Sequence, residues 1–218
     1  MAKEVKEADL RKVEVSGHVQ ELVANPSALG LFGLAMVTLV ASSQKLGWTG
    51  PAEVGVIPWA IFLGALAQFV AGIMDFKHNN TFGATAFCAY GVFWFGVAMT
   101  WMIKHGMFGA TAVQGLSNSG AQLGYAFLGY LIFTIIMTIG AMGTTKVLFT
   151  IFFLIDLLFL GLSMSVLTNQ PHGFWHNLAA WSELLISIFS FIGVAGNVLN
   201  THYKKQIVPL GKPFGPWV

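Results

Sequence analysis

Charged side chains are scarce in this chain of 218 residues. Asp, Glu, Lys and Arg together make up 9% of it, against about 25% in an average soluble protein. So few charges cannot cover the surface of a water-soluble domain. They also exclude an intrinsically disordered chain, which would be rich in polar and charged residues. Hydrophobic residues make up 56% of the sequence, so the composition predicts a membrane protein.

Other residue types and motifs are equally sparse. The single cysteine, Cys88, lies in an apolar run, which excludes a disulfide framework or a cysteine metal site within one chain. A net charge of +2 gives no reason to expect nucleic acid as a partner. The sequence has no phosphate-binding loop, zinc-protease motif or nucleophile constellation. His172 and His176 are four residues apart and are interpreted as interfacial. We therefore expect no enzyme activity, no cofactor and no metal.

Long runs without charge predict the membrane spans. Uncharged runs cover 22–44, 54–74, 78–103 and 105–145, and from 147 to 203 the only charges are Asp156 and Glu183. A helix needs about 20 apolar residues to cross a bilayer. The sequence therefore predicts an all-α, polytopic membrane protein with six helices around a narrow pore. The predicted helices are 26–44, 54–74, 82–103, 121–142, 147–167 and 174–200, and 104–120 is expected to be a loop.

The chain divides into three parts. Residues 1–24 are a polar tail, either solvated or a short amphipathic helix on the membrane surface. Residues 25–200 form the six-helix transmembrane domain, and 201–218 form a C-terminal tail rich in Pro and Lys. Nine of the eleven Lys and Arg residues lie on the side of the two tails. Because positive residues favour the cytoplasmic side, we expect both termini in the cytoplasm.

Two acidic residues stand out within the predicted helices. Asp156 lies near the middle of the fifth helix, and Glu183 lies about two turns into the sixth. A carboxylate at a helix centre costs about 2.5–3.5 kcal/mol on insertion scales. Such residues usually face a bundle interior or water. They are either a proton-titrating or pore-lining pair, or neutral carboxyl groups hydrogen-bonded at a helix interface.

Two sequence blocks resemble a known family. Residues 25–31, Asn-Pro-Ser-Ala-Leu-Gly-Leu, resemble the N-P-A-P-L-G-L signature of the acetate uptake transporter family, which includes bacterial acetate/succinate permeases. Residues 64–72, 75–77 and 80–87 resemble the family's second helix, following loop and third helix almost position by position. The likeness continues to about Pro209.

The resemblance implies a homohexamer in the plasma (inner) membrane, with a separate pathway through each subunit for acetate and related monocarboxylates, and succinate in some members. It also implies a hydrophobic constriction of Phe, Tyr and Leu. Tyr90 matches the tyrosine, whereas Leu34 stands where the family has Phe and Ile155 where it has Leu. The residues we expect along the substrate pathway are Asn25, Leu29, Gln68, Asn80, Thr81, Thr85 and Phe87.

Three functions remain open from the sequence. A passive channel for small carboxylates fits a pathway that has neutral polar groups and no Lys or Arg in its helix cores. A proton-coupled symporter would use Asp156 or Glu183, for which the family offers no counterpart. A channel for a neutral solute such as urea would suit the same uncharged groups.

Overall fold

The chain is all-helical over residues 24–216, the part that the structure, a computed structural model, describes. Six helical segments in this part are long and apolar enough to cross a membrane, which confirms the prediction of an all-α chain with six spans. They are α1 (Ser27–Lys45), a run from η2 to α3 (Glu53–Lys77), α4 (Thr81–Lys104), α6 (Gly120–Ala141), α7 (Lys146–Leu167) and α8 (Phe174–Tyr203). The N-terminal tail, predicted as solvated or amphipathic, lies outside the described residues.

The second span departs from the uniform helix predicted over 54–74. It consists of the short 3-10 turn η2 (Glu53–Gly55), α2 (Ile57–Trp59), the π-helical stretch η3 (Ala60–Ala67) and α3 (Gln68–Lys77). π-Helical turns are rare and occur often at functional sites. Because α3 continues to Lys77, Asp75 is buried in its last turn rather than placed in the expected polar loop.

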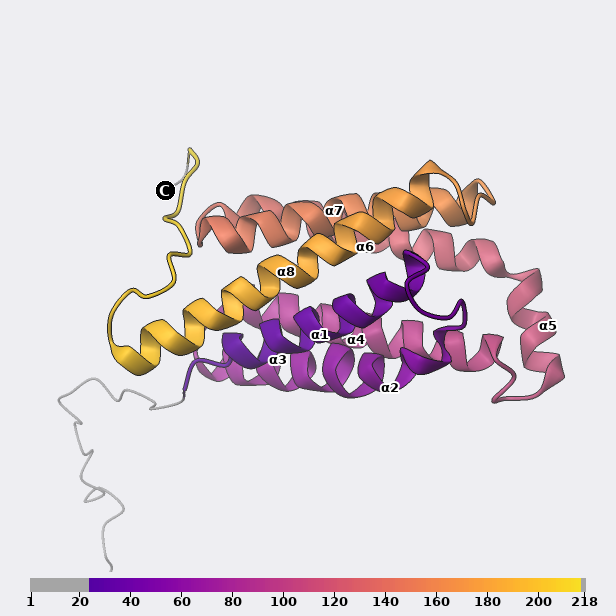
Figure 1. The fold of residues 1–218 in the computed structure, drawn as a ribbon, viewed down its shortest axis with the longest axis horizontal. Coiled ribbons are helices and arrows are strands. Elements are labelled where there is room, and N and C mark those ends of the chain that lie inside the picture. Colours follow the sequence, from indigo (N-terminus) through magenta and orange to yellow (C-terminus); the bar gives the residue numbers. More distant parts are fainter. Residues whose placement is uncertain (1–23, 217–218) are drawn as a thin grey trace, which may run out of the picture.

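The predicted loop 104–120 is also wrong in part, because it contains the short helix α5 (Ala110–Asn118). Gly109, with φ of +87°, begins a helix that has no buried residue and lies at the far end of the bundle in Figure 1. Gly, Ser and Asn are poor helix formers, and the segment carries Gly115, Ser117 and Asn118. The composition of this segment therefore resembles that of a loop, which is why the sequence predicted a loop there.

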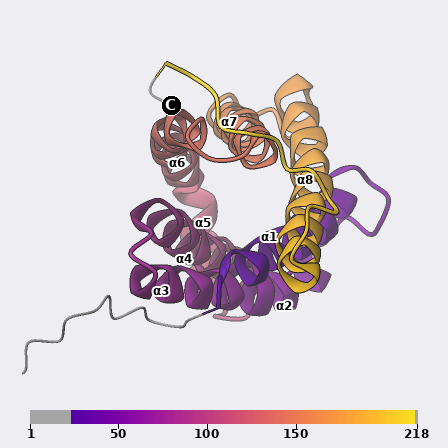
Figure 2. The ribbon, with the colours of Figure 1, turned by 90° about the vertical axis from the view of Figure 1, so that its left-hand side faces the viewer.

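Seen along the bundle, the six spans form a ring (Figure 2). α1 packs against α8, α8 against α7, and α7 against α6, while η3 and α3 pack against both α1 and α4. The ring closes between α4 and α6, where the Tyr130 hydroxyl donates to the Ala89 carbonyl at 2.9 Å. The described chain begins and ends at the same end of the bundle (Figure 1), as an even number of spans requires.

The first and last spans lie side by side although the whole chain separates them. The Ser187 hydroxyl of α8 donates to the Ala35 carbonyl of α1 at 2.8 Å. One turn and a half further along α8, Gly193 leaves room for Leu31, since a Cβ atom on that glycine would lie 2.9 Å from the leucine side chain. Small residues of this kind let membrane helices approach closely.

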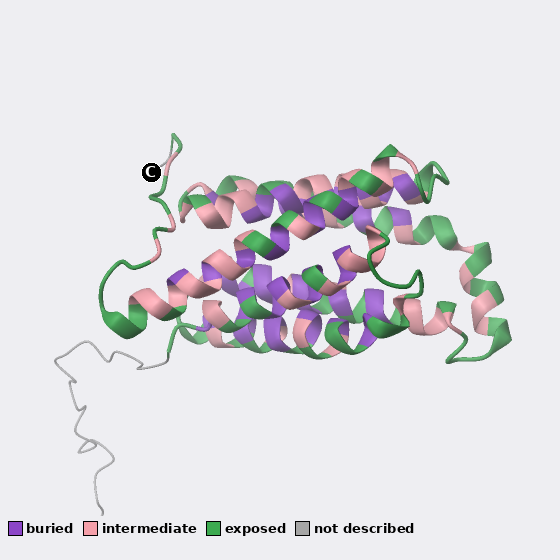
Figure 3. Ribbon diagram, in the orientation of Figure 1, coloured by how far each residue is buried: buried purple, intermediate pink, exposed green. Residues whose placement is uncertain are grey.

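The outer surface of the ring is apolar. Figure 3 shows exposed residues along the outward surfaces of the helices. On α6 four exposed isoleucines, Ile132, Ile135, Ile136 and Ile139, are each between 47% and 63% accessible. Large apolar side chains in such numbers mark a membrane or protein contact surface. The molecule is therefore built for a hydrocarbon surrounding.

The tail after α8 folds back across the end of the bundle that holds the first residues of α1. Asn200 holds it with three hydrogen bonds: its Nδ2 donates to the Val208 carbonyl at 2.8 Å, and its Oδ1 accepts from the N–H groups of Ile207 and Val208 at 2.7 and 2.9 Å. The Val147 N–H donates to the Leu210 carbonyl at 3.0 Å, which ties the tail to the start of α7.

Replacing Asn200 with Ala should release this tail. Each lost hydrogen bond contributes about 0.5–1.5 kcal/mol, so trypsin cleavage after Lys204 and Lys205 should become roughly tenfold faster. Limited proteolysis in detergent, followed by mass spectrometry, measures the rate. Asn197→Ala is the matched control, because Asn197 donates to Gly193 within α8 and leaves the tail contacts intact. Equal cleavage rates in both variants would show that Asn200 does not hold the tail.

Candidate functional site

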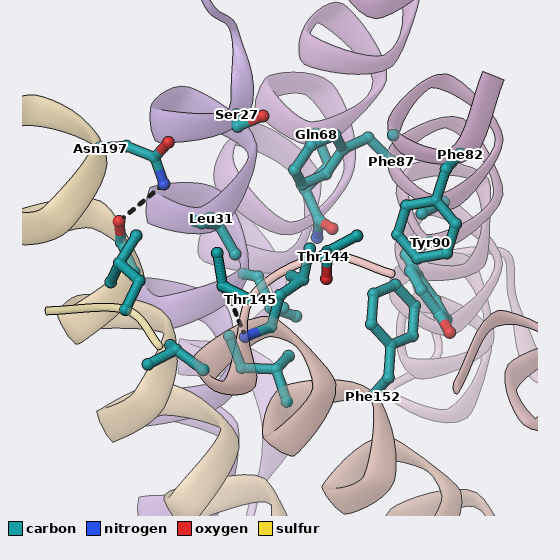
Figure 4. Close-up of a pocket in the computed structure, with 18 of the residues that line it drawn as sticks. Ser27, Leu31, Gln68, Phe82, Phe87, Tyr90, Thr144, Thr145, Phe152 and Asn197 are labelled. Atoms are coloured by element: carbon teal, nitrogen blue, oxygen red, sulfur yellow. Dashed lines mark hydrogen bonds between the residues drawn. The ribbon is translucent and has the colours of Figure 1, made fainter. Parts of the chain in front are cut away.

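A cavity of about 200 Å³ lies at the end of the bundle where the described chain begins and ends. Residues from the starts of α1, α4 and α7, the end of α8 and the tail line this first cavity. Figure 4 shows their side chains gathered around it. Its polar side chains are all uncharged: Ser27, Gln68, Asn80, Thr144, Thr145 and Asn197. Neutral donors and acceptors of this kind can hold a polar solute without fixing it as firmly as an opposite charge would.

Gln68 is the most deeply buried of these polar groups. Its Nε2 donates to the Gly64 carbonyl at 2.7 Å, in the π-helical stretch that precedes it. Its Oε1 has no hydrogen-bond partner, although the side chain is fully buried. A buried acceptor without a partner is costly, because it has lost water and gained nothing in return. The first cavity is therefore lined by a side chain whose buried acceptor lacks a hydrogen-bond partner.

The three predicted constriction residues line the inner part of the same cavity. Leu34 of α1, Tyr90 of α4 and Ile155 of α7 are 7%, 5% and 3% exposed. Residues one helical turn further along α4 and α7, Trp94 and Leu158, line a different cavity. One turn of helix spans about 5.4 Å. The structure thus brings the three residues together as a thin apolar partition.

An aromatic layer, which sequence reasoning missed, backs this partition. Phe159 is 1% exposed, lines neither cavity, and stacks on Tyr90 with ring centroids 6.4 Å apart. Its edge meets Phe93 at 5.0 Å, and it stacks on Tyr130 at 5.5 Å. Phe93 and Phe159 lie at similar depth on α4 and α7, the two helices that flank α6 in the ring. That shared depth in two predicted spans is the sequence signal that could have identified them.

The partition and the acidic residue of α7 each form a hydrogen bond with α6, one helical turn apart. The Tyr90 hydroxyl and Thr134 Oγ1 of α6 are 2.9 Å apart. One turn along α6, the Thr138 hydroxyl donates to Asp156 Oδ2 at 2.7 Å. Asp156 lines neither cavity, and its Oδ1 is buried without a partner. It therefore lies at the α6–α7 interface, one step behind the partition and outside the two cavities.

The second cavity, of about 370 Å³, lies at the opposite end of the bundle. It differs from the first in carrying charge. Its charged and titratable lining residues are Lys45, Glu53, Lys104, His172, His176 and Glu183. Glu53 accepts from Lys104 Nζ at 2.6 Å and contacts His105 Nε2 at 2.9 Å. Lys104 is 56% exposed, so this group forms the outer rim of the second cavity.

Glu183 is not an isolated acid. Its Oε2 accepts from Lys45 Nζ at 2.9 Å, and the two side chains are 2% and 12% exposed. The sequence predicted that the first helix ends at residue 44, before Lys45, and that the helix cores hold no cation. Both expectations are corrected, because Lys45 is the last residue of α1 and its side chain turns into the cavity wall. Its position one residue past the predicted helix end concealed this.

The other predicted pathway residues divide into two groups. Asn80 and Phe87 line the first cavity with Gln68. Four predicted residues line neither cavity and are exposed in the single chain: Asn25, Leu29, Thr81 and Thr85. Asn25 instead accepts the Ser27 N–H at 2.9 Å and so helps to start α1.

Among residues 24–216 no group of three or more His, Cys, Asp or Glu side chains is arranged to hold a metal ion. The histidine pair His172 and His176, with ring centroids 5.8 Å apart, is at the mouth of the second cavity.

The fold and the two cavities define a multi-pass membrane protein of the transporter or channel class. The chain belongs to the GPR1/FUN34/yaaH family, whose sequence model matches residues 11–208. It is 31% identical to the succinate-acetate/proton symporter SatP of Escherichia coli K12, over 87% of this chain and 96% of SatP. It is 33% identical to acetate permease A of Emericella nidulans, over 88% of this chain and 68% of that protein.

A solved structure agrees with the fold. The structure of the bacterial acetate channel SatP matches with a TM-score of 0.76 and 29% sequence identity, covering 87% of this chain and 99% of that one. The resemblance seen in the sequence blocks is therefore confirmed. Because these relatives are transporters and channels, the expectation that the chain is not an enzyme is confirmed as well.

Proposed function

We propose that this protein lets acetate and similar small monocarboxylates, and succinate as a larger substrate, cross the membrane along the axis of each six-helix subunit, as a channel does. The observation that carries the proposal is the pair of cavities at opposite ends of one ring, with the partition of Leu34, Tyr90 and Ile155 and the aromatic layer of Phe159 behind it between them. The names of the relatives supply the substrate class. The family resemblance favours a hexamer in the plasma membrane with both termini in the cytoplasm.

The first cavity and the partition together suit a carboxylate that carries a small apolar group. In the first cavity, hydroxyl and amide groups can donate to the carboxylate oxygens while it sheds water. The partition then offers apolar side chains, which the methyl group of acetate tolerates. A hydrated inorganic ion loses its water there and gains no partner, so the partition opposes its passage.

One observation favours a second candidate, in which the carboxylic acid crosses with its proton. The buried Gln68 Oε1 can only accept a hydrogen bond, and a protonated carboxyl group is the form of the substrate that can donate one. Asp156 is the acid to test in this scheme, because it is linked through α6 to Tyr90. Glu183 is less suited, since Lys45 already holds it as an ion pair.

Flux measurements on purified protein in liposomes test these alternatives. At pH near 7.5 only about one acetate molecule in a thousand is protonated, given a carboxyl pKa near 4–5, so leakage through the lipid is low. A channel should give labelled-acetate uptake that follows an imposed membrane potential and exceeds that of empty liposomes. Uptake that ignores the potential and follows a pH gradient supports the proton-coupled route. Uptake of urea without acetate would contradict both.

A further inference from the structure

The ion pair between Lys45 and Glu183 lies in the wall of the second cavity. Lys45 ends α1, Glu183 lies in the third turn of α8, and both border the cavity while being largely buried. Opposite charges buried in this way contribute little net stability, because the loss of water offsets their attraction. α1 and α8 also hold together without them, through the Ser187–Ala35 hydrogen bond and the fit of Leu31 against Gly193. The packing of α1 against α8 therefore does not explain why this ion pair is present.

The chemistry of the pair matches that of the proposed substrate. The Lys45 ammonium has three N–H donors, and among the described residues it gives one hydrogen bond, to Glu183. The Glu183 carboxylate is the same chemical group that acetate presents. A carboxylate that enters the second cavity can therefore bind the same ammonium and compete with Glu183 for it.

The other charged groups around this point are engaged elsewhere or lie at the mouth. Glu53 is held by Lys104 and His105 at the rim. His176 Nε2 lies 3.1 Å from the Lys45 carbonyl, so one nitrogen of that ring faces the helix end and fixes the position of Lys45. His172 is beside His176 at the entrance. Lys45 is consequently the buried cation that faces the cavity.

We propose that Lys45 binds the carboxylate of the passing substrate in the second cavity, and that Glu183 is a built-in competitor that keeps this binding weak. The inference rests on the proposed function and adds a binding residue to it. A pathway must attract its solute and also release it quickly. A free lysine would retain a carboxylate, whereas a lysine already paired with a glutamate can exchange one partner for the other.

Two single substitutions should have opposite effects on the apparent KM for acetate uptake. Glu183→Gln removes the competing charge, so the KM should fall about tenfold and the maximal rate should also fall, because release becomes slower. Lys45→Gln leaves Glu183 facing the cavity without its cation, so the KM should rise about tenfold. Lys205→Gln in the tail removes a positive charge away from both cavities, and its KM should equal that of the unchanged protein.

A double variant separates binding from folding. Lys45→Met with Glu183→Met removes both charges, which buried pairs tolerate well, and its KM should still rise because the attracting cation is gone. If both single variants shift the KM in the same direction, or the double variant keeps the original KM, Lys45 is only a link between helices and the inference fails. Absence of acetate uptake by the unchanged protein would instead refute the proposed function.

Discussion

Replacing Tyr90 with Ala should let larger carboxylates through the partition. Tyr90 is 5% exposed, forms part of the partition with Leu34 and Ile155, and stacks on Phe159. Removing its ring opens space on the axis between the two cavities. Uptake of butyrate or benzoate relative to acetate should increase about ten- to hundredfold, the range over which an apolar pocket discriminates by size. Liposome uptake of a series of labelled carboxylates measures the change.

Tyr90→Phe is the matched control for this experiment. It keeps the ring in place and removes only the hydroxyl that meets Thr134 at 2.9 Å. Its size preference should therefore remain that of the unchanged protein. If the alanine variant takes up the same series with the same preference, Tyr90 does not form the narrowest point and the partition lies elsewhere.

Substituting Gly161 with Leu should separate α7 from α8 and destabilise the protein. A Cβ atom at this position would lie 2.6 Å from the Trp175 carbonyl oxygen and 2.8 Å from the Ala179 nitrogen. Both atoms belong to the backbone, which cannot turn aside as a side chain can. Overpacking costs about 1–3 kcal/mol and occasionally more. The melting temperature in detergent and the yield of monodisperse protein should both fall.

Gly129→Leu is the matched control, and we expect this substitution in another membrane-spanning helix not to destabilise the protein. A Cβ atom on Gly129 of α6 meets nothing within 4 Å. Since Leu is a good helix former and Gly is a poor one, this variant should be as stable as the unchanged protein or slightly more so. Equal losses in the two variants would show that α7 and α8 do not pack through Gly161 as described.

The spans could be predicted from the sequence because the cost of a charge in a bilayer depends on the residue itself. The faces of the helices could not be predicted in the same way. Thr81 and Thr85 share α4 with Tyr90, yet they are exposed whereas Tyr90 lines the first cavity. A helix that is apolar on nearly every side has no polar stripe to mark its inner face. The residue types showed that this segment spans the membrane, but they did not show which of its side chains point toward the cavity.

The ion pair shows the same limit for long-range contacts. Lys45 and Glu183 are 138 positions apart, and nothing in either local sequence marks the other as its partner. The lysine lay outside the predicted helix 26–44, and the glutamate was a candidate proton carrier. Their meeting follows from the crossing of α1 and α8, which only the packed ring defines.

The neighbouring positions of the first and last spans determine when the ring can close during synthesis. At about 5–20 residues per second, a ribosome needs roughly ten to thirty seconds to proceed from the end of α1 to the end of α8. For most of that interval the wall that α8 supplies to both cavities is missing, and until α8 is made Lys45 has no Glu183 to meet. A nascent chain is thus an open arc of helices, and an enclosed interior arises only once translation of the last helix is complete.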